Sequence, residues 1–142
     1  MNLEDLVERW EKDCEFSSDI GEDLKDIPLL HYKYFKLLVS VKRKLNSSKE
    51  KYEEKKHVRT LFYSGRGSDD DYREEKFDHR LAKSEIPMWL AADKELKILR
   101  KEVEALTLFK ESLDEILKQI NNRHWYIKSM LDNKTIELGI RG

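Results

Sequence analysis

The side chains that could act as nucleophiles, bases or metal ligands are few and scattered in this chain of 142 residues. Its only cysteine is Cys14, and its histidines are His31, His57, His79 and His124. None of them has the spacing of a catalytic set or a zinc site, and there is no GxxxxGK[ST] loop to bind nucleotide phosphates. The run 69–71 (DDD) lacks the glycine and glutamate of a calcium loop. We therefore expect no enzyme activity, no metal site and no cofactor.

A basic segment offers a different chemistry. Residues 31–63 carry 10 Lys and Arg against 3 Asp and Glu, whereas residues 1–30 carry 3 against 10. A basic patch of this density is typical of proteins that bind polyanions. The alternative is that the acidic and basic segments pair with each other inside the fold. The overall net charge of −1 conceals both segments.

The strongest candidate site is the end of this basic segment, where cationic side chains meet an aromatic pair. Ammonium and guanidinium groups neutralise phosphates, and aromatic rings stack on unpaired bases. No helix-turn-helix pattern accompanies them, which favours single strands over sequence-specific duplex recognition. The candidate nucleic-acid-binding residues are Lys55, Lys56, His57, Arg59, Phe62, Tyr63 and Arg66. The structural alternative is that both rings pack at a helix end while the lysines are merely solvated.

The composition predicts long helices to position these residues. Charged residues make up 40% of the chain, with 5 Gly and 2 Pro, which is typical of helical and coiled-coil proteins. We expect one mainly α domain: N-terminal helices over 1–63, a loop and extended linker over 64–91, and oligomerisation helices over 92–142. No apolar run is long enough to span a membrane, the acidic start is unlike a signal peptide, and a single cysteine fits a reducing compartment.

The N-terminal half contains two predicted helices. The first covers about residues 2–14, and the second begins near Asp26 or Pro28 with an apolar stripe that runs to Leu45. Residues 46–60 are polar on nearly every side, which makes them a poor core element and a candidate contact surface. A mobile acidic loop is predicted over 64–80. Residues 84–90 are expected to be extended, because a residue that precedes proline disfavours the helical region.

The C-terminal half carries a heptad-like pattern in a helix that begins near residue 92. Asn121 and Asn122 are expected to break it, leaving a shorter helix over about 123–134. So much apolar surface in one chain predicts self-association. The seam residues are Leu96, Leu99, Val103, Leu106, Leu113, Leu117, Ile120, Ile127 and Leu131.

The order of several short blocks resembles one known family. Residues 59–67 (RTLFYSGRG) are similar to the central motif of the UvsY family of phage recombination mediator proteins. The N-terminal block 3–6 (LEDL) matches that family's opening. Residues 83–85 (KSE) and 92–94 (ADK) follow in the same order and spacing. The resemblance therefore spans nearly the whole chain.

The resemblance implies a helical, ring-like homo-oligomer of six or seven subunits in the cytoplasm of an infected bacterial host. Such a protein binds single-stranded DNA, loosens the phage single-strand-binding protein and promotes loading of a RecA-like recombinase during recombination, repair and replication. Arg59 matches one of two basic positions linked with DNA contact in the family. The other falls at His57, where a lysine would fit the pattern better and where Lys55 or Lys56 can substitute. The competing hypothesis is a helical oligomeric scaffold or adaptor protein without nucleic-acid binding.

Overall fold

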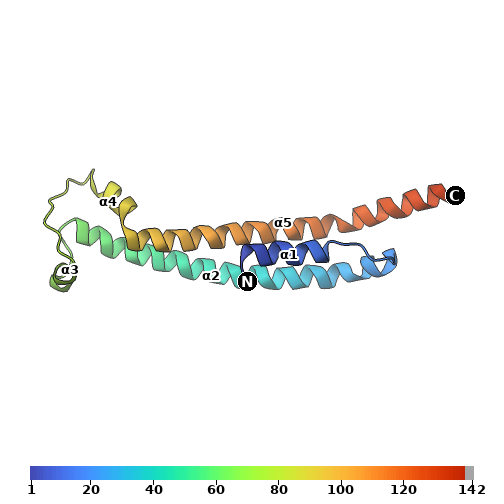
Figure 1. The fold of residues 1–142 in the computed structure, drawn as a ribbon, viewed down its shortest axis with the longest axis horizontal. Coiled ribbons are helices and arrows are strands. Elements are labelled where there is room, and N and C mark those ends of the chain that lie inside the picture. The colour runs from blue at the N-terminus through green and yellow to red at the C-terminus, as the bar shows by residue number, and fades with distance from the viewer. Residues whose placement is uncertain (140–142) are drawn as a thin grey trace. The chain divides into compact units, whose positions relative to one another are not determined.

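The computed structural model describes residues 1–139, which form five helices and no strand (Figure 1). The predicted mainly α fold class is confirmed, and residues 140–142 of the predicted C-terminal segment lie outside the described part. In the order of the chain, the helices are α1 (Leu3–Asp13), α2 (Ile20–Tyr63), α3 (Asp69–Glu74), α4 (Ile86–Ala92) and α5 (Lys94–Glu137). Within residues 1–139, no helix is long and apolar enough to cross a membrane.

The chain divides into two compact units. Unit 1 combines residues 1–42 with the chain from residue 108 onward, and unit 2 comprises residues 43–107. Both α2 and α5 contribute to each unit. Unit 1 contains the largest buried core, and unit 2 contains the candidate site.

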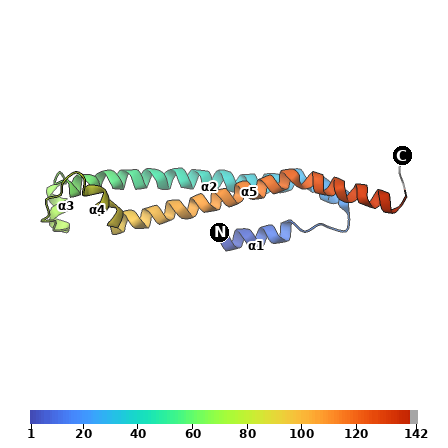
Figure 2. The ribbon, with the colours of Figure 1, turned by 90° about the horizontal axis from the view of Figure 1, so that it is seen from above.

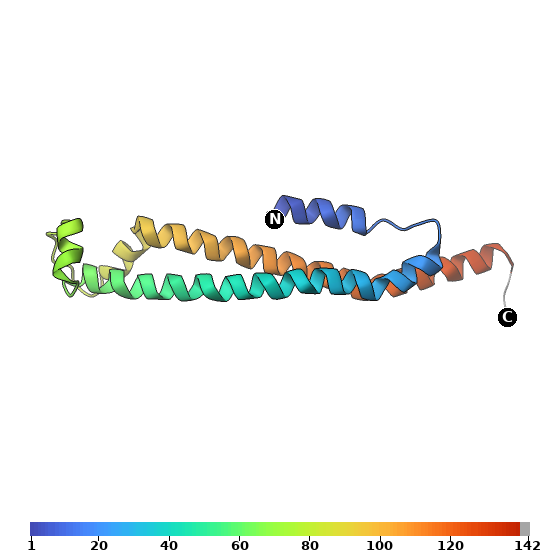
Figure 3. The same cartoon turned by 90° about the horizontal axis from the view of Figure 1, so that it is seen from below.

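Unit 1 is a bundle of α1 with the first part of α2 and the second part of α5. The turn between α1 and α2 reverses the chain, so that α1 and α5 run opposite to α2 (Figures 1 and 3). Apolar residues at helical spacing on all three helices meet in one core. The buried core residues are Leu6, Tyr34, Leu38, Val41, Phe109, Leu113, Ile116, Leu117 and Ile120.

The predicted oligomerisation seam is largely internal to the chain. Leu113, Leu117 and Ile120 pack in the core of unit 1, and Ile127 is also fully buried. In unit 2, Leu96 is buried and the seam positions 99, 103 and 106 are half-buried. Leu131 alone among the seam residues is exposed, at 43%. In unit 1, α1 and α2 of the same chain cover these positions of α5, so the intermolecular role predicted for them stays a prediction.

The start of α2 lies six residues before the earlier of its two predicted positions. The Asp19 carboxylate accepts hydrogen bonds from the backbone N–H groups of Gly21 and Glu22, at 2.9 and 3.3 Å. Such an N-cap satisfies donors that the first helical turn leaves unpaired. Pro28 therefore lies inside the helix and not in its first turn.

The predicted break at Asn121 and Asn122 is wrong, since α5 continues to Glu137. Arg123 holds this part of the helix against the end of α1. Its Nη1 and Nη2 groups donate to the carbonyl oxygens of Cys14 and Glu15, both at 3.1 Å. Two asparagines cost little helix propensity, and this tertiary contact outweighs it.

Candidate nucleic-acid interface

The SGRG motif at residues 64–67 is the C-terminal cap of α2. Gly65 has a φ of +80°, and the N–H of Arg66 donates to the Leu61 carbonyl at 2.8 Å. The N–H of Gly65 donates to the Phe62 carbonyl at 3.2 Å. These two bonds define a Schellman cap, which needs a left-handed residue at the glycine position. The motif therefore ends the helix and fixes where the chain places Arg66.

The acidic run is the first turn of α3, within the stretch predicted to be a loop. Ser68 and Asp71 form a reciprocal capping box, with distances of 3.1 and 3.2 Å. Within the predicted loop over 64–80, residues Asp69–Glu74 are therefore helical, and the chain on either side of them is not. Carboxylates are favoured in the first turn because of the positive end of the helix dipole, which explains the aspartates without a ligand. No group of three or more possible metal-binding side chains occurs in residues 1–139.

Tyr72 fastens α3 to the end of α2. Its hydroxyl donates to the Phe62 carbonyl at 2.8 Å and accepts from the N–H of Gly67 at 3.1 Å. A Cβ atom on Gly67 would lie 3.2 Å from the Tyr72 ring. Glycine at position 67 thus permits this close approach.

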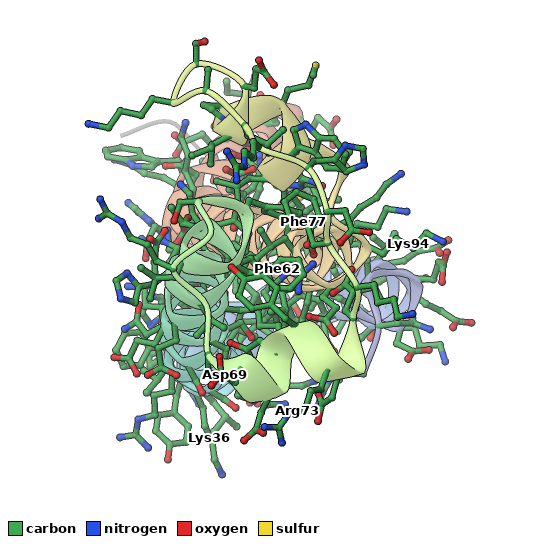
Figure 4. All side chains as sticks on the ribbon, turned by 90° about the vertical axis from the view of Figure 1, so that its left-hand side faces the viewer. Lys36, Phe62, Asp69, Arg73, Phe77 and Lys94 are labelled. Atoms are coloured by element: carbon green, nitrogen blue, oxygen red, sulfur yellow. The ribbon has the colours of Figure 1, made fainter. Side chains whose placement is uncertain are left out.

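An aromatic cluster anchors the rest of the connection between α2 and α5. Phe62 and Phe77 lie side by side in Figure 4, with ring centroids 5.3 Å apart, while Asp69 and Arg73 lie on α3. The cluster rings are Phe62, Tyr63, Tyr72, Phe77 and Trp89. Phe62 is 1% exposed and Tyr63 7%. Their faces are used for packing, so neither ring is available in this structure to stack on a base.

Arg59 lies beneath this cluster and all of its guanidinium nitrogens are engaged. Its Nε donates to Asp93 at 2.6 Å, Nη1 to Glu75 at 2.8 Å, and Nη2 to the Tyr63 hydroxyl at 3.1 Å. The Tyr63 hydroxyl in turn donates to Asp93 at 2.6 Å. The Arg59 side chain is 10% exposed, and that of Asp93 is 2% exposed. Arg59 is therefore a buried ion-pair partner and not a free surface cation.

The buried carboxylate of Asp93 is stabilised in its charged form. Burial by itself raises the pKa of Asp93, but hydrogen bonds from Tyr63, from the N–H of Leu96 and from Arg59 outweigh it, so the pKa lies below its usual 3.8. For Arg59, burial opposes the charge, but the bonds to Glu75, Tyr63 and Asp93 leave the pKa raised. The pair stays ionised at neutral pH.

Acid is expected to destabilise unit 2 through Asp93. A carboxyl group with a lowered folded-state pKa stabilises the fold fully above its unfolded pKa, about 3.9, and loses that contribution as the pH falls through the folded value. Urea unfolding of the wild type and of Asp93→Asn at pH 5 and pH 3 checks this, because asparagine still caps α5. The wild type should lose more stability between the two pH values. Equal losses in the two proteins would contradict the assignment.

A groove in unit 2 is lined by three exposed cationic side chains. Lys56, Arg66 and Lys83 line a cavity of about 650 Å³ in unit 2, which we call the basic groove. The remaining lining residues are Thr60, Leu61, Ser64, Leu81, Ile86, Pro87 and Leu90. No carboxylate lines it, and within residues 1–139 none of the three cations forms an ion pair. A groove lined by apolar side chains and by three cations that form no ion pair within the described residues suits a polyanion that also carries apolar surface.

Helix α4 supplies the far wall of the basic groove. Residues 84–90 were expected to be extended, but α4 begins at Ile86 with Pro87 in its first turn. Proline is tolerated there because the first-turn N–H groups have no partner within the helix. Figures 1 and 2 show α3 and α4 at the end of unit 2 where α2 stops and α5 starts.

The other predicted basic residues lie apart from the basic groove. Lys55 pairs with Glu95 at 2.8 Å. His57 is exposed, and its helical spacing from Glu50 and Glu54 places it on an acidic face of α2. Of the seven predicted site residues, only Lys56 and Arg66 thus line the basic groove.

Two basic residues, Lys49 and Lys83, were not among the predicted nucleic-acid-binding residues. Lys49 is exposed and lies two helical turns before Lys56, so it extends the same side of α2. That spacing was readable from the sequence. Lys83 lies within the connection between α2 and α5, whose path depends on the aromatic cluster. No local sequence pattern indicates that Lys83 lines the groove.

With the site described, comparisons with known proteins decide the family. The family model described as "Recombination, repair and ssDNA binding protein UvsY" matches residues 9–140. The chain belongs to the UvsY family. Recombination protein uvsY of Enterobacteria phage T4 is 25% identical over 140 residues, which cover 98% of this chain and 99% of the T4 protein.

Solved structures of the same relative have the same fold. A crystal structure of the bacteriophage T4 recombination mediator protein UvsY (lattice type II) has a TM-score of 0.89 and 26% identity, covering 97% of this chain and 98% of that one. A second crystal form (lattice type IV) has a TM-score of 0.88 and 25% identity, covering 96% and 99%. The UvsY fold thus extends over nearly the whole length of both chains.

Proposed function

We propose that this UvsY-family protein is a recombination mediator without catalytic activity of its own. It binds single-stranded DNA and promotes loading of a RecA-like recombinase onto DNA covered by the phage single-strand-binding protein, in the cytoplasm of the infected host. The name of the matching family supports DNA binding, and the basic groove supplies a surface for it. The single observation that carries the proposal is a groove lined by three cations and no carboxylate, in which none of the cations forms an ion pair within residues 1–139.

The chemistry of the groove suits a flexible strand. Phosphates would contact Lys56, Arg66 and Lys83, while an unpaired base can turn its apolar face toward the aliphatic side chains that line the groove. A duplex keeps the faces of its bases stacked inside, so it cannot offer them to these side chains. Binding through phosphates is expected to be steeply salt-dependent.

A fluorescence-anisotropy titration of a labelled single-stranded oligonucleotide tests the proposal. We expect binding that weakens steeply with added salt and resists duplex competitor. No binding at low salt would reject the proposal and favour the scaffold hypothesis, in which basic residues serve internal pairs such as Lys33 with Asp13. Loading is tested separately, by following labelled recombinase on oligonucleotide covered with the single-strand-binding protein, with and without this protein.

We infer that the expected homo-oligomer assembles through unit 1, where two exposed faces have complementary charge. On α1, Val7 is 57% exposed and lies among acidic residues. On α2, Leu29 and Tyr32 are 69% and 60% exposed beside a groove with basic neighbours. The acidic neighbours are Glu4, Glu8 and Glu11, and the basic ones are Arg9 and Lys36, since Lys33 is paired with Asp13. Two different faces that meet head to tail generate a ring when the rotation closes.

The introduction of negative charge on the α2 face is expected to dissociate the oligomer. Leu29→Glu with Tyr32→Glu places two carboxylates opposite the acidic face of α1 in the next copy, and like charges across an interface are strongly unfavourable. Mass by light scattering should fall while helicity by circular dichroism is retained. The matched control is Met88→Glu, at a residue 67% exposed in unit 2, which should keep the mass of the wild type. An unchanged mass for the double variant would refute this interface.

A further inference from the structure

Arg59 occupies the position that the family resemblance links with DNA contact, yet the structure gives it a different set of partners. Its three nitrogens are bound to Asp93, Glu75 and Tyr63, at 2.6, 2.8 and 3.1 Å. Its plane also lies over the rings of Phe62 and Tyr63, at 4.3 and 4.9 Å from the guanidinium carbon to the ring centroids. Arg59 is also absent from the lining of the basic groove. A phosphate would have to displace an acid to reach it.

The partners of Arg59 lie at two turning points of the connection. Glu75 is the C-cap of α3, and Asp93 is the N-cap of α5. One guanidinium thus ties the end of α2 to two points that are 18 residues apart in the sequence. Lys83 lies between these two points, and Arg66 lies just before α3. The position of Lys83 therefore depends on these bonds, whereas the C-terminal cap of α2 places Arg66.

We propose that Arg59 is a positioning residue, which holds the chain between Glu75 and Asp93 so that Lys83 lines the basic groove together with Arg66, and that it does not contact DNA itself. This inference rests on the proposed DNA-binding function. A planar guanidinium can bond three partners in fixed directions, whereas a lysine ammonium is a single point charge on a flexible stem. Arg59→Lys therefore keeps the positive charge but removes the planar group that bonds Asp93, Glu75 and Tyr63 at once.

A double-mutant cycle separates positioning from contact. Arg59→Lys is compared in the wild type and in a background that carries Arg66→Gln and Lys83→Gln, with single-stranded oligonucleotide affinity as the readout. Residues that act through one another are non-additive. We expect Arg59→Lys to weaken binding about fivefold in the wild type and by less than about twofold in the background. Equal losses in both would show that Arg59 acts independently of the groove cations, and would overturn the proposal.

Hydrogen exchange of the DNA-free protein gives a second readout. Arg59→Lys should raise amide exchange within 64–91 while leaving that of α1 at the wild-type level. Unchanged exchange in 64–91 would overturn the proposal. Where Arg59→Lys unfolds unit 2, seen as lost helicity, Tyr63→Phe replaces it in both measurements, because it removes only the hydroxyl that joins Arg59 and Asp93.

Glu75 offers a matched comparison with its neighbour. Glu75→Gln and Glu74→Gln each remove one exposed negative charge, but only Glu75 pairs with Arg59. If Arg59 bound phosphate directly, freeing its Nη1 would make Glu75→Gln bind DNA more tightly than Glu74→Gln. Positioning predicts equal or weaker binding for Glu75→Gln.

The outcomes also separate this inference from the proposed function. Wild-type protein that fails to bind any oligonucleotide rejects both. Binding that survives unchanged in the Arg66→Gln, Lys83→Gln background rejects the groove and the role of Arg59, but leaves DNA binding at another surface. Additive effects of Arg59→Lys reject the positioning role alone.

Discussion

Replacing Lys56, Arg66 and Lys83 together with glutamine is expected to weaken single-stranded DNA binding on the order of 100-fold, at about 1 kcal/mol for each charged contact. These three side chains are the exposed cations of the basic groove, and none of them supports the core. Each neutralised phosphate also releases counterions, so the slope of log affinity against log salt should fall by about 2. Anisotropy titrations over a series of salt concentrations measure both quantities.

The matched control removes the same charge elsewhere in unit 2. Lys76, Lys97 and Lys101 are exposed and do not line the groove, and their triple glutamine variant changes the net charge equally. We expect it to keep most of the affinity and nearly the wild-type slope. If both triple variants lose affinity and slope alike, net charge alone determines binding and the groove has no special role. An oligomer repeats the groove, so the contrast should grow with oligonucleotide length.

Helical periodicity predicted most of the fold. Apolar spacing located α1, the stripe of α2 and nearly the whole of α5, because one face of each helix has to be buried. The errors at the starts of α2 and α4 lie at residues that can either begin a helix or belong to the segment before it. Asp19 capped a helix expected to begin at Asp26 or Pro28, and Pro87 began a helix where an extended segment was expected. Each depends on the local chain path, which periodicity does not determine.

The heptad pattern shows a second limit of the sequence. A row such as Leu113, Leu117 and Ile120 requires an apolar partner, but the pattern does not say whether that partner is another copy or the same chain. The structure supplies α1 and α2 as the partner in unit 1. The surface that we propose for contact with other copies is therefore a different one, around Leu29 and Tyr32, which are both exposed.

The candidate site was predictable in its location but not in its roles. The meeting of Lys56, Phe62, Tyr63 and Arg66 at the end of the basic segment indicated the end of α2, where the structure has the basic groove. Burial then divides this group, since the rings pack inside and the exposed cations line the groove. Sequence alone does not reveal that Asp93, 34 residues after Arg59, neutralises it. This ion pair is the reason for proposing a positioning role for Arg59 in place of the expected DNA contact.

Leu113→Asp is expected to unfold unit 1 and not merely to separate subunits. Leu113 is 0% exposed in the core of unit 1, and an aspartate there loses the apolar contacts and buries a charge without a partner. Such substitutions cost more than about 4 kcal/mol, which is comparable to the whole stability of many domains. Circular dichroism should show reduced helicity at 25 °C and an unfolding midpoint far below that of the wild type.

Leu108→Asp is the matched control because it lies five residues earlier on the same helix and is 51% exposed. An exposed substitution of this kind typically changes stability by about 0.5 kcal/mol or less, so the same chemical change should leave unit 1 folded. Light scattering distinguishes the two accounts of the seam. If Leu113→Asp keeps wild-type helicity and unfolding midpoint but falls to monomer mass, the seam joins different copies. If Leu113→Asp instead loses helicity and its unfolding midpoint falls, Leu113 stabilises the core of its own chain. That result would favour the face around Leu29 and Tyr32 as the surface for assembly.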